Sequence, residues 1–346
     1  MPIKVFNNLT KKIEEFHPLG EREREIQMYV CGVTPYDYSH LGHARTYAAF
    51  DVIKRYFEYR GYKVRYIQNI TDIDDKIIKR ANEVGADPLK LSLEFQKSAL
   101  EDMDALKIAR ADKYPKVTEH IPEIIALIKK LISRGYAYET EDGVYFEVEK
   151  FPDYGKLSKQ SLDEIKAGAR VEIDEKKRNP ADFALWKKAK PGEPFFESPW
   201  GKGRPGWHIE CSAMSMKYLG DNFDIHGGGR DLIFPHHENE IAQSEGATGK
   251  QFVKYWLHTG FLSVNKEKMA KSLGNFITIK DALKKHDADS LRLFYALTHY
   301  RSPIDFSDKN VEYAHNALEG LRNTLTNARN ALANADEKNH EKTINT

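Results

Sequence analysis

The amino-acid sequence predicts an α/β protein with a doubly wound parallel sheet that is split by an inserted α+β domain. Three observations support this fold class. A strand–helix–strand pattern occupies residues 28–69, a second α/β stretch begins at residue 207, and the residues between them follow another pattern. Because strand–helix–strand units with short connections give parallel strands and right-handed crossovers, we expect one parallel sheet.

The first unit contains a short buried strand at 28–31 and a helix that begins near 39–42 and ends at Gly61. A second strand follows, with its pattern in residues 62–67 and its end at Asn69. The helix is expected to bury one apolar face, made of Ala49, Val52, Ile53, Tyr56 and Phe57. Ligands of such sheets bind beyond the carboxyl ends of the strands, so the residues that follow each strand are candidates for function.

The middle of the chain has a helix at 122–134, closed by Gly135, and a short strand at 143–146. The α/β pattern returns with a helix at 207–219 and a strand at 223–225. We therefore divide the chain into five parts. They are the two halves of the sheet domain (1–118 and 207–262), the insertion (119–206), a lysine-rich region (263–306), and a helix followed by a polar tail (307–346).

Composition excludes several classes of protein. No apolar run approaches the ~20 residues that cross a bilayer, and the amino terminus lacks a signal-peptide pattern, so we expect a cytoplasmic protein without a membrane partner. Two cysteines cannot form a disulfide framework. A net charge of +1 neither indicates nor excludes a nucleic-acid partner.

The stretch "SHLGHAR" lies where a strand leads into a helix. Gly42 allows a ligand to approach the helix N-terminus, which favours an anion, and His40 and His43 can donate to phosphate oxygens. The alternative is two surface histidines beside a packing glycine.

The stretch "KEKMAKSLGN" places Lys268 and Lys271 three residues apart, in a loop with a Gly-Asn turn. Such a loop suits the negative charge that develops on a leaving pyrophosphate. The alternative is a solvated lysine loop.

In "FPHHENEIAQSE", Pro235 is placed to open a helix that carries His236 and Glu240 on one face. Together with Cys31 and Cys211, they would make a Cys₂-His-Glu set of zinc ligands. A core histidine with an exposed glutamate is the alternative interpretation.

Taken together, an early H-x-G-H and a late K-M-x-K-S in a split doubly wound domain resemble the two signatures of class I aminoacyl-tRNA synthetases. Five blocks specifically resemble the cysteinyl-tRNA synthetase family. They are "MYVCGVTPYDYSHLGHAR", "NITDIDDKIIKRA", "RPGWHIECSAM", "FDIHGGGRDLIFPHHENEIAQSE" and "KMAKSLGN". The resemblance runs from about residue 5 to residue 306.

The resemblance implies a Rossmann-like catalytic domain, with 263–306 as the stem-contact region, that forms cysteinyl-adenylate from L-cysteine and ATP and transfers the cysteinyl group to the acceptor end of tRNA(Cys). It implies one Zn²⁺ per chain, which binds the substrate thiolate, and Mg²⁺ that accompanies ATP. The implied site residues fall into three sets. They are Cys31, Cys211, His236 and Glu240 for zinc; His40, Gly42, His43, Gly227, Gly228, Gly229, Lys268 and Lys271 for ATP and its reaction; and Thr34, Thr71, Trp207 and Asp231 for cysteine.

Two departures from the family pattern stand out. Ala270 replaces the usual serine of K-M-S-K-S, and the helical domain that usually follows is missing, so we expect adenylate formation to be retained and tRNA affinity reduced. We expect a monomer. The alternatives are a cysteine ligase with an amino-sugar acceptor, of the mycothiol type, and a non-catalytic protein that binds tRNA or cysteine. A persulfide activity that involves Lys76 and Lys79 is also associated with the family, although paired lysines on an amphipathic helix are ordinarily only solvated.

Overall fold

A four-stranded parallel sheet forms the centre of the molecule and confirms the predicted fold class. The computed structural model describes residues 2–20, 24–162, 164, 177–270 and 273–344. The sheet has the order β10–β9–β3–β4, with strands β3 (Glu25–Val33), β4 (Lys63–Ile70), β9 (Phe223–Gly229) and β10 (Val253–Thr259). The chain adds β4 on one side of β3 and later β9 on the other, so strand order reverses between β3 and β9. Ligands of doubly wound sheets bind at the carboxyl ends of the strands beside such a reversal.

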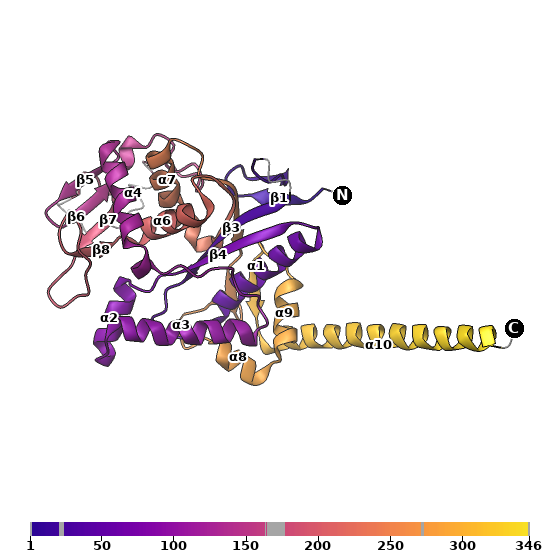
Figure 1. Cartoon of the computed structure of the whole chain (residues 1–346). Helices are drawn as coiled ribbons and strands as arrows, with labels where there is room; N and C mark the ends of the chain where they lie inside the picture. The colour runs from indigo at the N-terminus through magenta and orange to yellow at the C-terminus, as the bar shows by residue number, and fades with distance from the viewer. Residues whose placement is uncertain (1, 21–23, 163, 165–176, 271–272, 345–346) are drawn as a thin grey trace.

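Helices cover this sheet and link it to the remaining parts (Figure 1). Those up to the second half of the sheet are α1 (Leu41–Tyr59), α2 (Asp75–Val84), α3 (Pro88–Ala105), α4 (Ile121–Ser133), α6 (Trp207–Leu219) and α7 (Glu238–Thr248). Those that follow are α8 (Ile279–Lys285), α9 (Ala288–Ala296) and α10 (Asp308–Ile344). The predicted bounds of α4 and α6 agree with these to within one residue. None of the helices in the described part of the chain has the length and apolar character needed to span a bilayer.

The sequence correctly predicts the position of α1 but not all of its buried face. Val52 and Tyr56, which were expected inside, are 46% and 48% exposed. The buried side of α1 instead includes Arg45 and Asp51, two charged residues that a search for apolar periodicity leaves out. The reason is that α1 packs against α9 as well as against the sheet, and that second contact is partly polar.

The segment between the two halves of the sheet forms a separate antiparallel sheet of four strands. Its strands are β5 (Ala137–Thr140), β6 (Gly143–Phe146), β7 (Phe183–Lys188) and β8 (Gly203–Pro205). The apolar face of α4 is buried through Ile124, Ile128 and Leu131, as its periodicity predicts. Figure 1 shows this sheet at one end of the molecule, beside α6 and α7.

Among the described residues, five short strands lie outside these two sheets, and four of them are β1 (Lys4–Asn7), β2 (Lys12–Glu15), β11 (Leu262–Val264) and β12 (Glu267–Lys268). With β13 (Ile304–Phe306), β11 and β12 form a third sheet next to α8 and α9. Helix α10 projects away from the body (Figure 1). Its leucines Leu321, Leu325 and Leu332 are more than half exposed. The helix continues to Ile344, so it includes most of the residues that were expected to form a polar tail after it.

Two buried charged residues of α1 fix the amino-terminal end of this helix to the α8–α9 region. Arg45, which is 2% exposed, donates from Nη1 to the carbonyl of Tyr295 at 2.7 Å and from Nη2 to that of His299 at 2.9 Å. The carboxylate of Asp51 accepts from Arg55 at 3.0 Å and from Arg292 at 2.6 Å. The turn at the start of α1 is thereby held at a set distance from α9.

Replacing Arg45 with methionine (Arg45→Met) is expected to lower the free energy of unfolding by about 2–4 kcal/mol, because buried carbonyl groups lose charge-assisted donors. The matched control is Arg55→Met. Its side chain is 53% exposed and Asp51 keeps Arg292, so the loss should stay below about 1 kcal/mol. Chemical denaturation measures both, and equal losses would show that Arg45 contributes no more than a surface ion pair.

Candidate metal and nucleotide site

Four side chains from distant parts of the sequence converge beside the carboxyl ends of β3 and β9. Cys31 lies near the carboxyl end of strand β3, and Cys211 lies in helix α6. His236 lies in the segment just before α7, and Glu240 lies in the first turn of α7. One ligand atom from each lies within 4.8 Å of all the others. The Sγ atoms of the two cysteines are 3.9 Å apart and both thiols are free, while His236 Nε2 lies 3.1 Å from Glu240 Oε1.

Burial decides the charges within this group. All four side chains are less than 10% exposed, so the expected alternative of an exposed glutamate was wrong. Burial raises the pKa of the Cys31 thiol well above its usual value, whereas a hydrogen bond from Cys31 lowers the pKa of Cys211 to about 6. Burial disfavours the charged forms of His236 and Glu240. The attraction between them outweighs this for His236, and contacts with both His226 and His236 outweigh it for Glu240, so the pKa values are about 10 and about 2. Without a metal, the two therefore form a buried ion pair.

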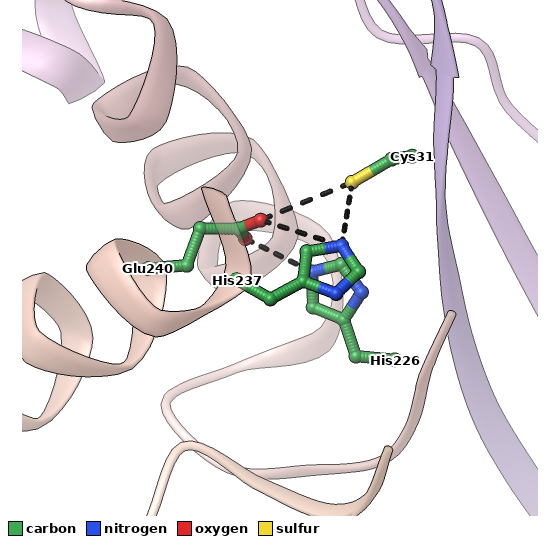
Figure 2. A group of neighbouring side chains, drawn as sticks. All are labelled: Cys31, His226, His237 and Glu240. Atoms are coloured by element: carbon green, nitrogen blue, oxygen red, sulfur yellow. Dashed lines mark hydrogen bonds and ion pairs between the residues drawn. The ribbon is translucent and has the colours of Figure 1, made fainter. Parts of the chain in front are cut away.

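A second set of donors overlaps the first (Figure 2). It consists of Cys31, His226, His237 and Glu240, whose ligand atoms also lie within 4.8 Å of one another. His237 Nε2 is 3.3 Å from Cys31 Sγ, and His226 Nε2 is 2.9 Å from Glu240 Oε2. The two sets share Cys31 and Glu240, so a single tetrahedral ion can use only one of them.

The chemistry of the donors favours zinc in the first set. Ligand atoms at 2.0–2.3 Å around one tetrahedral zinc ion lie about 3.3–3.8 Å apart, which the observed spacing approaches. The first set contains the sulfur atoms of both cysteines of the chain, and soft thiolates are preferred zinc ligands. Ligand binding by His236 would require its proton to be released, as is usual for metal sites.

In this arrangement the remaining histidines would support the ligands. His208 Nδ1 lies 3.0 Å from His236 Nδ1, and His226 bonds the oxygen of Glu240 that faces away from His236. His237 Nδ1 is 2.8 Å from His258 Nε2, which continues the chain of contacts behind Cys31. The sequence analysis missed these histidines, although one signal was available: His226 directly follows Ile225 and His258 directly follows Leu257, each within a strand.

The "SHLGHAR" motif forms the N-terminus of α1. His40 is the N-cap residue, its Nδ1 accepts from Gly42 N at 3.1 Å, and His43 Nδ1 accepts from His40 N at 3.3 Å. The two rings stack with centroids 3.9 Å apart. A Cβ atom at Gly42 would lie 2.9 Å from the His40 ring, so the stack requires glycine. Burial lowers the pKa of His43 well below its usual value, and because Nδ1 accepts, the neutral ring carries its proton on Nε2.

The lysine loop is fastened to this helix start. Leu41 N donates to Ile277 O at 3.2 Å, Ile279 N donates to Ser39 O at 2.9 Å, and a Cβ at Gly42 would be 3.8 Å from Met269 Cε. The two motifs are therefore adjacent. Lys268 is exposed in β12, whereas Lys271 lies outside the described residues.

The side chain of Asn275 closes the loop. Its Oδ1 accepts from Ala270 N at 2.8 Å, and its Nδ2 donates to Lys268 O at 3.1 Å. Position 270 thus contributes its backbone N–H group to the loop. The contact with Asn275 therefore does not depend on which side chain stands at position 270.

The glycine triplet has a packing role beside its expected role in ATP binding. A Cβ at Gly227 would lie 2.1 Å from the Phe50 ring, and a Cβ at Gly228 would lie 2.8 Å from Leu232. Both glycines are buried, whereas Gly229 is partly exposed. Only Gly229 therefore offers backbone surface for a nucleotide.

The residues predicted to bind cysteine surround the donor group at different depths. The Trp207 ring, which is 37% exposed, lies 4.3 Å from that of His236. Thr71 is buried and donates to the neighbouring Glu210 at 3.3 Å. Thr34 follows β3, and the exposed Asp231 follows β9. All four lie at the carboxyl edge of the sheet or on the helix that begins beside it.

Comparison with known proteins identifies the family of this chain. The family described as "tRNA synthetases class I (C) catalytic domain" matches residues 16–316. The chain is 64% identical over 321 residues to a cysteine–tRNA ligase of Thermococcus gammatolerans, which covers 93% of this chain and 67% of that relative. It is 64% identical over 316 residues to the cysteine–tRNA ligase of Pyrococcus abyssi, with 91% and 66% covered. This chain belongs to the cysteine–tRNA ligases of class I. It spans about two thirds of the length of these cysteine–tRNA ligases.

Solved structures agree with the fold of a class I cysteine–tRNA ligase. A Mycobacterium tuberculosis methionyl-tRNA synthetase in complex with methionyl-adenylate superposes with a TM-score of 0.68 at 16% identity, covering 84% of this chain and 68% of the other. The Agrobacterium radiobacter K84 agnB2 LeuRS in a ternary complex with tRNA and LeuAMS gives 0.64 at 11% identity, covering 90% and 73%.

The packing role of Gly227 in strand β9 can be tested with the substitution Gly227→Ala. The added methyl group overlaps the Phe50 ring, so the free energy of unfolding should fall by about 1–3 kcal/mol, and the melting temperature should fall with it. Phe50→Leu removes the overlapping ring atoms and should recover part of that loss in the double variant. Gly320→Ala, which meets no atom within 4 Å on an exposed helix, is the control and should stabilise by up to about 1 kcal/mol. A strictly additive double variant would contradict the packing explanation.

Proposed function

We propose that this chain catalyses the reaction named by its relatives, with L-cysteine, ATP and tRNA(Cys) as substrates. The observation that carries the proposal is the convergence of Cys31, Cys211, His236 and Glu240 at the reversal of strand order, beside the paired motifs around His43 and Lys268. A thiol-selective site next to a phosphate-binding site fits the activation of cysteine by ATP. The name shared by the relatives supports tRNA as acceptor over an amino sugar.

Cysteine would be recognised by the donor group and the residues around it. Zn²⁺ held by Cys31, Cys211, His236 and Glu240 would supply a soft Lewis acid that prefers a thiolate to a hydroxyl group. This matters because an apolar pocket separates near-isosteres by only ~10²-fold. Trp207 would cover the side chain, and the carboxylate of Asp231 would pair with the substrate ammonium group.

In the first step, an oxygen of the cysteine carboxylate attacks the α-phosphorus of ATP, and the bond to the bridging oxygen breaks to release pyrophosphate. The Nε2–H groups of His40 and His43 would donate to phosphate oxygens at the N-terminus of α1, where the helix dipole favours an anion. Lys268 and Lys271 would stabilise the charge that develops on pyrophosphate, with Mg²⁺ bound to ATP as part of that substrate.

In the second step, a ribose hydroxyl of the terminal adenosine of tRNA attacks the carbonyl carbon of cysteinyl-adenylate. The hydroxyl proton is released and AMP departs with the electron pair of the broken anhydride bond. Neither step needs a protein nucleophile, so positioning and electrostatic stabilisation would supply the catalysis.

The purified chain is expected to show ATP–pyrophosphate exchange that depends on L-cysteine, with L-serine giving at least ~10²-fold less. His43→Asn should lower the exchange rate by about 10²-fold, because one phosphate donor is lost in the transition state. Lys250→Gln is the control. Lys250 lies just before β10, at the amino-terminal ends of the strands and away from the site, so its replacement should leave exchange unchanged. A zinc-loaded chain without any cysteine-dependent exchange would refute the proposed function.

Metal analysis distinguishes the two donor sets. We expect about one zinc per chain, lost in Cys211→Ala and in His236→Gln, whereas His226→Gln should weaken zinc binding by only about 10–100-fold through its contact with Glu240. Zinc retained in Cys211→Ala and lost in His226→Gln would place the ion in the second set instead.

A further inference from the structure

Three cationic residues lie where neighbouring strands end at the carboxyl edge of the sheet. Arg230 directly follows β9. Arg301 lies beside the end of β10, because Gly260 N donates to Tyr300 O at 2.8 Å. Lys11 lies in the turn after β1, a strand that is anchored to β10 through Asn8 N and Trp256 O at 2.9 Å. These residues therefore share the edge that carries the candidate site.

The positions of these cations are fixed by contacts from separate segments. The guanidinium carbon of Arg301 lies 3.2 Å from the centroid of the Phe6 ring of β1. The backbone N–H of Lys11 donates to Asn7 O at 2.8 Å. A fourth cation, Lys159, comes from the insertion, where the preceding N–H group of Ser158 donates to the Glu238 carboxylate at 2.7 Å.

Protein carboxylates do not neutralise this group. Within the described residues, none of the four cations forms an ion pair or a hydrogen bond from its charged end. Partial burial, followed by the charges of Lys159 and Arg230, lowers the pKa of Lys11, with Arg301 acting in the same direction. Glu238 acts in the opposite direction, but its carboxylate already accepts from two backbone N–H groups. The cluster is therefore electrostatically unfavourable until an anion binds.

We infer that Lys11, Lys159, Arg230 and Arg301 form a phosphate-binding cluster for the single-stranded acceptor end of tRNA. This rests on the proposed function for the identity of the nucleic acid. The cluster draws on the turn after β1, on the insertion, on the end of β9 and on the region after α9, so it suits a chain of phosphates better than one phosphate group. The triphosphate of ATP has its own expected donors at His40 and His43.

The experiment measures binding of an RNA hairpin that carries the acceptor stem and its 3′ single-stranded end, by fluorescence anisotropy with the full chain. Lys11→Gln and Arg230→Gln should each raise the Kd about three- to tenfold. Each should also make the slope of log K against log salt less negative by about 0.7, the contribution of one phosphate contact in a single strand. A blunt hairpin without the 3′ end should bind both variants as it binds the unmodified chain.

Lys250→Gln provides the matched control, because it removes one exposed lysine charge at the opposite edge of the sheet, just before β10. Arg301→Gln is interpreted only with its melting temperature, since its stacking on Phe6 also stabilises the fold. Lys11 is exposed and makes no such contact, so Lys11→Gln keeps the test valid if Arg301→Gln unfolds.

Cysteine-dependent ATP–pyrophosphate exchange separates this inference from the proposed function. Exchange and the KM for ATP should be unchanged in Lys11→Gln and Arg230→Gln. A raised KM for ATP would overturn the inference in favour of a nucleotide phosphate site, and hairpin binding identical to that of Lys250→Gln would also overturn it. Absence of exchange in the unmodified chain would instead count against the proposed function.

Discussion

The pairing of β3 with β9 is the constraint on which the site depends. Tyr29 is directly opposite His226 and Val30 is opposite Gly227, so the strand that delivers Cys31 runs beside the strand that delivers the histidine behind Glu240. This close approach is possible because position 227 has no side chain to displace the Phe50 ring of α1. The absence of a side chain at position 227 therefore affects three features together. They are the packing of α1 on the sheet, the pairing of β3 with β9, and the assembly of the donor group.

The buried donor group illustrates how this fold retains charge in its interior. An ionised carboxylate in such a place costs several kcal/mol unless partners satisfy it. Glu240 meets His236 through one oxygen and His226 through the other, and each of these contacts is about 3 Å long. Because both oxygens are engaged, the carboxylate has a fixed orientation before any ligand arrives, and the same is true of the imidazole of His236 through His208.

Local patterns in the sequence were sufficient for most elements of the fold. Helix α6 and strand β6 have the predicted bounds because a glycine or a turn marks their ends, and α4 buries the residues that its periodicity selects. The four candidate metal ligands could be proposed from residue chemistry and from resemblance, since two cysteines, a histidine and a glutamate are recognisable types. What could not be predicted is long-range polar contact. Val52 and Tyr56 are exposed, whereas Arg45 and Asp51 lie on the buried face of α1. The partners of Arg45 and Asp51 are the carbonyl of Tyr295 and the side chain of Arg292, which are far away in the sequence and could not be inferred from local patterns. His226, His237 and His258 were missed for the same reason, since their partners are set by tertiary structure.

The two anchors of the lysine loop have a consequence for how this segment can vary. Its entry is held by β12, its exit is bonded to the residues on either side of His40, and Asn275 links its two limbs. Asn275 bonds the backbone of residues 268 and 270, and the backbone of Ile277 and Ile279 bonds that of Leu41 and Ser39, so a shift of either anchor would separate backbone groups from their partners. Because these contacts use the backbone of positions 268 and 270, they constrain the path of the loop at its anchors and leave the identity of the side chain at position 270 unconstrained by them.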